Sequence, residues 1–338
     1  MGQKSQKMLL FLVGDFVEDY EAMIPYQMAL MGFSKNVTAP RVLTVSPGKK
    51  EGDTVATAIH DVENEKDQSY TEKRGHNFAI NFSWDSLTEE VWSQCDGLYI
   101  PGGRAPEYIR LDQKVLEITR WFMDHNKPIS AMGHGAQVLT AAKCIKGKKL
   151  TSHLHCEPEV TRAGGVYQQC KDDGVVVDGN LVTGVSWLGH AAVMREWLKL
   201  IGVTWKQSGK SCNVLMLVGD FVEDYEAMNV CQMLELAGVE VGTISPHKLS
   251  TDRVKTSVHD FEGFATYTEK PGHLLKLNMD WGMYCSDKGV TSDINTVDAL
   301  YIPGGRSPEY LRLNPGVQSL VEWFMSKNKP VATICHGP

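Results

Sequence analysis

Short runs of hydrophobic residues alternate along the chain with longer segments in which hydrophobic positions recur every three or four residues. The runs predict buried β-strands at 8–13, 41–46, 97–103 and 128–132. The longer segments predict amphipathic helices at 21–32 and 112–126. Strands that alternate with helices indicate a parallel sheet with helices on both faces. Ligands bind such sheets beyond the carboxyl ends of the strands.

The same pattern occurs twice. The segment LVGDFVEDYEAM at 12–23 recurs at 217–228, and LYIPGGRAPEYIRL at 98–111 recurs as LYIPGGRSPEYLRL at 300–313. The blocks YTEKRGH and WFMDHNKPISAMGHG have counterparts in the same order, YTEKPGH and WFMSKNKPVATICHG. The preserved order indicates a tandem duplication of a whole α/β domain. We predict a first domain at 1–205, a polar linker at 206–212 and a second domain at 213–338.

The two copies differ in how far they extend past their last shared motif. After Gly133 the first copy continues through strand-like segments at 148–160 and 174–186 and a helical segment at 187–202. Only three residues follow Cys335. We therefore expect the second domain to be C-terminally truncated, without at least two strands and a terminal helix. The chain is interpreted as a fragment or a truncated gene product.

Composition excludes several classes of protein. The 338 residues carry 34 basic and 41 acidic side chains, a net charge of −7. The chain therefore has no excess of positive charge that would attract nucleic acid or an anionic membrane, and neither is expected as a partner. The N-terminus predicts neither a signal peptide nor a membrane span. Eight scattered cysteines, without a C-x-x-C pair or zinc-finger spacing, indicate reduced thiols in the cytoplasm or nucleus, and no metal.

Candidate chemistry lies first at Cys335, where the strand-like PVATI runs into Cys-His-Gly. A strand that turns sharply at one residue is typical of a nucleophile elbow. In such an elbow a helix N-terminus lowers the pKa of the thiol. The alternative is a buried core cysteine, which is the commoner situation. Because two other repeated motifs also end strands, we favour the reactive site.

The first copy has Gly133 at the corresponding position. Glycine adopts a strained backbone without steric cost, so the turn can persist without its nucleophile. This substitution excludes covalent chemistry at the first site. His134 and His336 follow the two tips. Each is interpreted either as a group that orients or protonates a substrate, or as a packed histidine.

Carboxylates precede the first helix of each copy. Glu21 and Glu226 are the candidates to contact the elbow and act as general acid or base. The other acidic residues of these loops are interpreted as charges that complement the helix dipole: Glu18, Asp19, Glu223 and Asp224.

The Pro-Gly-Gly loops at Gly102–Gly103 and Gly304–Gly305 present backbone N–H groups without side chains. Such groups can form an oxyanion hole, and a tight turn is the alternative. The repeated YTEK-x-GH block predicts a loop near the mouth of each site, with ordinary packing as the alternative. Its tyrosines and histidines are Tyr70, His76, Tyr267 and His273.

These motifs together resemble the DJ-1/PfpI superfamily. They are Glu-x-x-Ile-Pro in the first copy, Pro-Gly-Gly in both, and Ala-x-x-Cys-His-Gly in the second. The tandem arrangement with HDFEG and YTEKPGH resembles the plant two-domain branch. The resemblance covers essentially the whole chain. It implies two flavodoxin-like domains of the class I glutamine amidotransferase-like fold, packed as an internal pseudo-dimer.

The resemblance also implies roles for individual residues. In the second copy the family pattern assigns the nucleophile to Cys335, the contacting carboxylate to Glu226 and the oxyanion site to Gly305. Glu21 and Gly103 remain in a degenerate first site. The segment LTSH resembles the histidine-bearing strand of the family, with His153 as its candidate.

Active tandem members of the family resemble glutathione-independent glyoxalases (glyoxalase III). The implied function is conversion of methylglyoxal or glyoxal to a hydroxy acid, with a small aldehyde as substrate and no cofactor. The alternative is a redox-responsive or protein-binding relative with little catalysis, in which Cys335 acts as a sensor. Gly133 in the first site favours this alternative, and the family lineage favours the glyoxalase.

Overall fold

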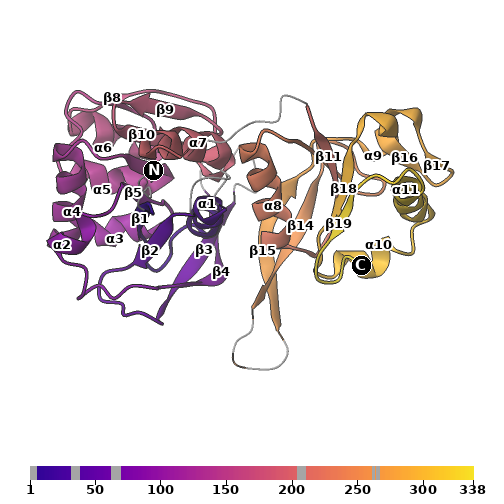
Figure 1. The fold of residues 1–338 in the computed structure, drawn as a ribbon, viewed down its shortest axis with the longest axis horizontal. Helices are drawn as coiled ribbons and strands as arrows, with labels where there is room; N and C mark the ends of the chain where they lie inside the picture. The colour runs from indigo at the N-terminus through magenta and orange to yellow at the C-terminus, as the bar shows by residue number, and fades with distance from the viewer. Residues whose placement is uncertain (1–5, 32–38, 62–69, 204–210, 261–262, 264–266) are drawn as a thin grey trace, which may run out of the picture. The chain divides into compact units, whose positions relative to one another are not determined.

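The computed structural model describes residues 6–31, 39–61, 70–203, 211–260, 263 and 267–338. Residues 206–210 of the expected linker lie outside this part of the chain. The chain divides into two compact units. The first comprises Met1–Ala58 and Arg74–Lys206, and the second comprises Ile59–Lys73 and Gln207–Pro338. Each unit is an α/β structure built on a mostly parallel sheet, so the predicted fold class is confirmed (Figure 1).

The first unit contains a six-stranded sheet in the order β2-β1-β5-β6-β10-β9. Only β9 runs antiparallel to its neighbour. The strands are β1 (Met8–Leu12), β2 (Arg41–Val45), β5 (Gly97–Ile100), β6 (Ile129–Met132), β9 (Val175–Asp178) and β10 (Leu181–Gly184). Since β2 and β5 lie on opposite sides of β1, the strand order reverses at β1, which is where open α/β sheets bind ligands.

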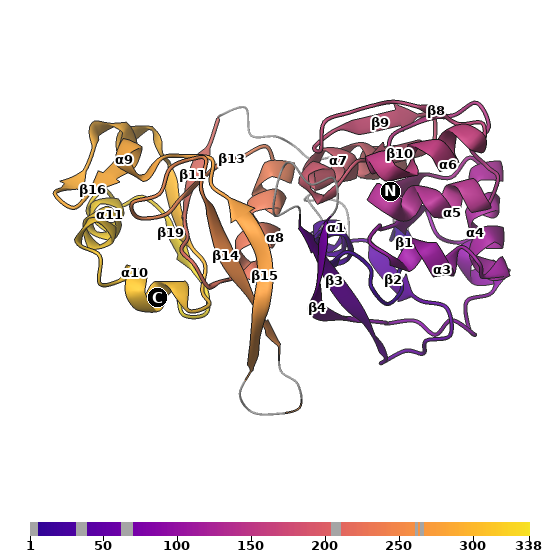
Figure 2. The ribbon, with the colours of Figure 1, turned by 180° about the vertical axis from the view of Figure 1, so that it is seen from behind.

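Helices cover both faces of this sheet because successive strand residues point in opposite directions (Figures 1 and 2). Phe11 contacts Tyr26 of α1 (Asp19–Leu30) and Trp197 of α7 (His190–Ile201) on one face. Leu10 and Leu12 belong to the core on the other face, with residues of α4 (Gln113–Asp124) and α5 (Ala136–Ala141). The strands and helices predicted from hydrophobic spacing are therefore present.

The second unit repeats the central part of this sheet. Its four strands run parallel in the order β13-β11-β18-β19. They are β11 (Asn213–Leu217), β13 (Glu240–Ile244), β18 (Ala299–Ile302) and β19 (Val331–Thr333). Its principal helices are α8 (Asp224–Leu236), α10 (Ser307–Leu311) and α11 (Pro315–Ser326).

Strand β19 is less covered than its counterpart β6. All four residues of β6 are buried, whereas β19 is half-buried to exposed. A cavity of about 630 Å³ lies beside it, lined by residues of α10 and α11 such as Leu311 and Val317. In the first unit, α5 packs its apolar residues into the core at the corresponding place. Among the described residues, no helix of the second unit occupies this cavity.

Each copy of the repeat contains a long hairpin. Strands β3 (Thr54–Asp61) and β4 (Thr71–Ala79) pair with each other, as do β14 (Arg253–Asp260) and β15 (Thr268–Lys276). All of each YTEK-x-GH block except its tyrosine lies on β4 or β15. The predicted loop is therefore wrong, and the packing alternative fits the two histidines, His76 and His273, which are buried strand residues. The shorter elements are α2 (Glu89–Trp92), α3 (Ala105–Ile109), β7 (Lys149–Leu150), α6 (Glu157–Arg162), β8 (Val166–Tyr167), β12 (Val222–Glu223), α9 (Trp281–Tyr284), β16 (Cys285–Ser286) and β17 (Gly289–Val290).

Candidate active site

Three segments of the second unit meet beyond the carboxyl ends of its parallel strands. Glu226 follows β11, the Gly304–Gly305 loop follows β18, and Cys335 follows β19. Contacts confirm their proximity. A side-chain carbon added at Gly304 would lie 2.6 Å from Cβ of Cys335 and 2.7 Å from Oε2 of Glu226. The fold thus brings together the predicted nucleophile, carboxylate and glycine loop.

Cys335 occupies a strained turn. Its φ is 57°, in the left-handed region that side-chain-bearing residues seldom adopt. All eight cysteines are described, and Cys335 is the one exposed thiol among them. Burial raises the pKa of Cys95 to about 12 and that of Cys285 to about 11, so those thiols are poor nucleophiles at neutral pH. Accessibility therefore singles out Cys335.

Glu226 is held in place at the start of α8. Glu223 caps the helix, and its Oε2 accepts a hydrogen bond of 2.8 Å from the backbone N of Glu226. Oε2 of Glu226 accepts a hydrogen bond of 2.6 Å from the N–H of Gly304. Burial raises the pKa of Glu226, whereas hydrogen bonds from Gly304 and from the Cys335 side chain partly oppose this rise.

One backbone N–H of the glycine loop is already used in a hydrogen bond to Glu226. Because the N–H of Gly304 donates to Glu226, Gly305 is the remaining candidate of the two glycines expected to form an oxyanion hole. Gly305 has a φ of 73° and pairs with Val222 in an isolated bridge. A side chain at Gly305 would meet the backbone N of Glu223 at 2.4 Å, so glycine is required there.

His336 lies next to the nucleophile and faces outward. Its Nδ1 is 3.8 Å from Oε1 of Glu309, and both side chains are largely exposed. Sequence reasoning did not single out Glu309, although it occupies the same position in the repeated PGGR-x-PE motif as Glu107. An exposed ion pair of this kind is a weak constraint, so His336 is free to reorient toward a ligand.

The first unit reproduces the carboxylate and glycine loop but not the thiol. Oε2 of Glu21 accepts a hydrogen bond of 2.6 Å from the N–H of Gly102, and Gly103 has a φ of 71°. Burial, reinforced by the charge of Glu18, raises the pKa of Glu21 to about 8. A side chain added at Gly133 would first meet Oε1 of Glu21, at 3.3 Å. The space for a nucleophile is therefore present without the nucleophile.

Three imidazoles lie beside this degenerate site. The rings of His134 and His153 are stacked with centroids 4.8 Å apart, and His155 packs edge-on against His153 at 4.6 Å. His153 was expected on a strand, and this is wrong: β7 ends at Leu150, and His153 caps a short 3₁₀ helix at Leu154–Cys156. Its backbone N still donates to the carbonyl of Gly133, at 3.4 Å.

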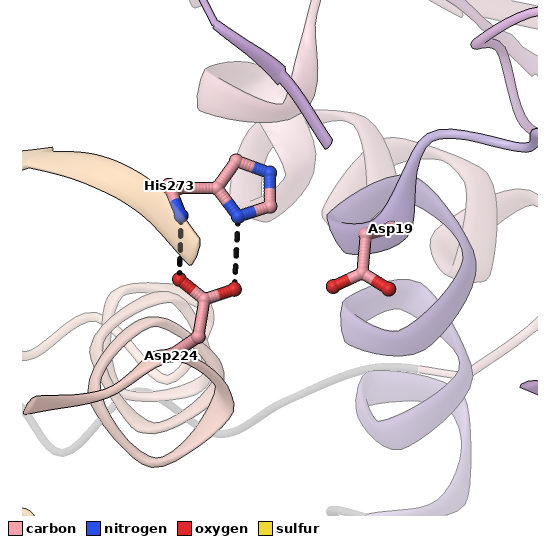
Figure 3. Close-up of side chains that lie close together, drawn as sticks. All are labelled: Asp19, Asp224 and His273. Carbon is pink, nitrogen blue, oxygen red and sulfur yellow. Dashed lines mark hydrogen bonds and ion pairs between the residues drawn. The ribbon is translucent and has the colours of Figure 1, made fainter. Parts of the chain in front are cut away.

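Buried aspartate–histidine pairs stand at the start of α1 and α8. In the second unit, His273 donates from its backbone N to Asp224 (3.1 Å), and its Nδ1 lies 2.8 Å from the same carboxylate (Figure 3). The first unit has the same pair in Asp19 and His76, at 3.1 and 2.9 Å. Asp19 and Asp224 were interpreted only as charges that complement the helix dipole, so their pairing with histidines was not predicted. The Gly-His dipeptide that occurs in both copies was the sequence feature that could have indicated these partners.

No helix among the described residues is long and apolar enough to cross a bilayer.

The DJ-1/PfpI family model matches residues 7–200 and 212–338. The architecture is thus that of a tandem α/β protein with a cysteine elbow beside a half-buried glutamate. The chain belongs to the DJ-1/PfpI family.

Several known proteins resemble the chain. Protein DJ-1 homolog D of Arabidopsis thaliana is 42% identical over 334 residues, which cover 98% of this chain and 81% of the relative. DJ-1 protein homolog F of the same plant is 31% identical over 353 residues, covering 100% of this chain and 82% of the relative. Deglycase PfpI of Pyrococcus furiosus is 31% identical over 193 residues, 57% of this chain and 98% of the relative. Schizosaccharomyces pombe DJ-1 matches as a structure with a TM-score of 0.46 at 18% identity, covering 57% of this chain and 90% of that one.

Proposed function

We propose that the protein is a glutathione-independent glyoxalase that converts small 2-oxoaldehydes such as methylglyoxal to 2-hydroxy acids at the site of Cys335. One observation carries the proposal: the single exposed thiol sits in a left-handed turn beside the half-buried carboxyl group of Glu226. A nucleophile whose neighbour is an acid–base group is the arrangement that carbonyl addition followed by proton transfer requires.

The reaction needs no oxidant or reductant. Sγ of Cys335 bonds to the aldehyde carbon, and the carbonyl oxygen takes up the thiol proton to give a hemithioacetal. Glu226 then removes the proton from that carbon and delivers it to the neighbouring ketone carbon through an enediol. The proton of the hemithioacetal hydroxyl passes to the ketone oxygen in the same rearrangement, which leaves a thioester and a new hydroxyl group. Water cleaves the thioester, which releases the hydroxy acid and the free thiol.

The environment of Glu226 suits a group that must both accept and donate a proton. Burial raises its pKa from the ordinary value of 4.5, which moves it toward the operating pH. The hydrogen bond from Gly304 fixes one carboxyl oxygen. Gly305 contributes the N–H that would face the substrate oxygen, with no side chain in the way.

The experiment is consumption of methylglyoxal, with quantification of lactate, in the absence of glutathione. We expect Glu226→Gln to lower turnover by about 10²-fold or more, because the amide cannot exchange the proton. Glu21→Gln is the matched control in the first unit, where Gly133 supplies no nucleophile, and it should keep the native rate. Equal rates in the two variants would contradict the proposal.

The exposure of Cys335 also favours a second candidate, a redox-responsive role. Its thiolate would attack hydrogen peroxide, release water and form a sulfenic acid, which a second peroxide converts to a sulfinic acid. Peptide mass spectrometry after peroxide treatment would then show two added oxygens at Cys335 but not at buried Cys285. Such oxidation in a protein without aldehyde turnover would favour this role over the glyoxalase.

A further inference from the structure

An apolar cavity between α10, α11 and β19, the α10–α11 groove, distinguishes the second unit from the first. Its volume is about 630 Å³. Apolar side chains from five elements line it: Leu217, Ile302, Leu311, Val317, Val321 and Val331. The side chains of Val321 and Val331 are only half-buried, so the groove is open to solvent. An apolar hollow that stays open in this way is typical of an interaction site.

The first unit shows which kind of segment fills the corresponding space. Five of the lining residues have apolar counterparts there: Leu12, Ile100, Ile109, Val115 and Ile129. All five counterparts are buried in one core cluster with Val138 and Leu139 of α5. Because α5 packs against α3 and α4, its two adjacent aliphatic side chains close the hollow between those helices.

The walls of the two spaces are built from nearly the same sequence. PEYIRL at 106–111 forms one wall in the first unit, and PEYLRL at 308–313 forms it in the second. The one difference exchanges Ile109 for Leu311, which has the same number of carbon atoms. Since the groove keeps the walls that hold α5 in the first unit, a helix of the same kind fits between them.

The charge at the rim of the groove also indicates an occupant. In the first unit, Nη1 of Arg110 lies 2.8 Å from Oε2 of Glu159, on α6. Arg312 is the counterpart of Arg110 and lines the groove. Nε of each arginine donates to a carbonyl three residues earlier, at 3.2 Å, so the two side chains begin alike. Among the described residues, no carboxylate forms an ion pair with Arg312. An occupant with an acidic side chain placed like Glu159 would provide one.

We propose that the α10–α11 groove is a docking site for a separate polypeptide segment that resembles α5 and α6. The segment is an amphipathic helix with two adjacent aliphatic side chains, followed by a carboxylate that pairs with Arg312. The aliphatic side chains fill the groove, and the ion pair fixes the orientation of the helix. A second copy of this chain does not present such a segment, because its own Val138 and Leu139 are buried in its first unit.

The groove extends to the residues beside the nucleophile. His336 and Gly337, which follow Cys335 in the chain, are among its lining residues. A docked segment would therefore contact the elbow from the side of α10 and α11. The docking itself does not depend on the proposed aldehyde chemistry, because neither Glu226 nor Gly305 lines the groove.

The test uses a synthetic peptide with the sequence of residues 136–162, which contains Val138, Leu139 and Glu159. The peptide carries a fluorophore, is kept reduced, and is titrated with the full chain while fluorescence anisotropy is measured. We expect saturable binding with a dissociation constant on the order of 10 μM. Val138→Asp in the peptide should weaken binding by about tenfold or more, because an unpaired charge is costly in an apolar groove. Absence of binding, or equal binding of the two peptides, would overturn the inference.

The ion pair allows a matched comparison between the two copies. We expect Arg312→Glu to weaken binding of the peptide by about fivefold, and Glu159→Arg in the peptide to restore it. Arg110→Glu is the control, and it should bind the peptide like the native protein because α5 already fills the first unit. If Arg110→Glu weakens binding as much as Arg312→Glu does, the peptide enters the first unit and the inference is wrong.

A third variant fills the groove itself. Val321→Trp places a larger side chain on the half-buried wall of α11 and should abolish binding of the peptide. Leu313→Trp, at a position that is 73% exposed and outside the groove, is the control and should bind normally. Sedimentation equilibrium of the native protein checks the other occupant. A dimer that Val321→Trp dissociates would show that a second copy covers the groove, and would overturn the assignment to a separate segment.

Discussion

Gly133 and Cys335 have the same left-handed backbone conformation at corresponding turns, with φ values of 46° and 57°. The turn that follows the strand adopts this conformation whether or not a thiol is present, and in the first unit it leads into α5. In the first unit glycine adopts it without strain, whereas in the second unit the cysteine bears a cost of about 1–2 kcal/mol. A strained residue at a catalytic position is expected when its function, rather than its packing, requires the side chain.

Gly133→Cys should therefore create a second reactive thiol. The new Cβ would meet Oε1 of Glu21 at 3.3 Å and nothing closer, a contact that a small shift of the Glu21 side chain relieves. We expect the free energy of unfolding to fall by about 1 kcal/mol, because glycine no longer relieves the strain. Denaturant unfolding and peptide mapping after alkylation measure the two effects.

Gly202→Cys is the control for this substitution. Gly202 also has a positive φ, of 88°, and a side chain there would meet nothing within 4 Å. We expect Gly202→Cys to lower the free energy of unfolding by a similar amount. Its new thiol should be alkylated at the rate of an ordinary exposed cysteine. If Gly133→Cys reacts no faster than Gly202→Cys, the surroundings of Glu21 do not activate a thiol.

Gly304→Ala should abolish turnover without unfolding the protein. Its methyl group would lie 2.6 Å from Cβ of Cys335 and 2.7 Å from Oε2 of Glu226, so both groups must shift. A displacement of about 1 Å costs on the order of 10²-fold in rate. Gly282→Ala, in α9 with open space around it, is the control and should keep the native rate. Native turnover in Gly304→Ala would show that these contacts do not govern the reaction.

The raised pKa of Glu21 makes stability depend on pH. Burial raises this pKa from 4.5 in the unfolded chain to about 8 in the folded protein. The folded state therefore binds more protons between these values. The contribution is fully present below pH 4.5 and is lost as the pH rises, by about 1.4 kcal/mol for each unit. Glu21→Gln, which can still accept from Gly102, should lose this dependence.

The measurement is the difference in unfolding free energy between the native protein and Glu21→Gln at several pH values. We expect the variant to gain stability relative to the native protein as the pH rises from 5 to 8. Groups that titrate in both proteins contribute equally to the two unfolding free energies, so their contributions cancel in this difference. A difference that stays constant with pH would show that Glu21 has an ordinary pKa in the folded state.

The repeated sequence predicts the strands, the principal helices and the convergence of Cys335, Glu226 and Gly305. These follow from hydrophobic spacing and from motifs that end successive parallel strands. The pairing of Asp224 with His273 and of His259 with Glu269 could not be predicted in this way. Those contacts depend on how β14 and β15 pair, and this register includes an irregularity between Lys255 and Ser257. The repeated YTEK-x-GH block marks the second strand of the hairpin in both copies. The sequence does not indicate which side chains of that strand are buried.

The most direct test is conversion of methylglyoxal to lactate, without glutathione, by the native protein and by Cys335→Ser. The account predicts turnover in the native protein and its loss in the variant, because no other thiol is exposed. Circular dichroism should show the same fold in both. Equal turnover in the two proteins, or none in the native protein, would contradict the assignment of the chemistry to the second elbow.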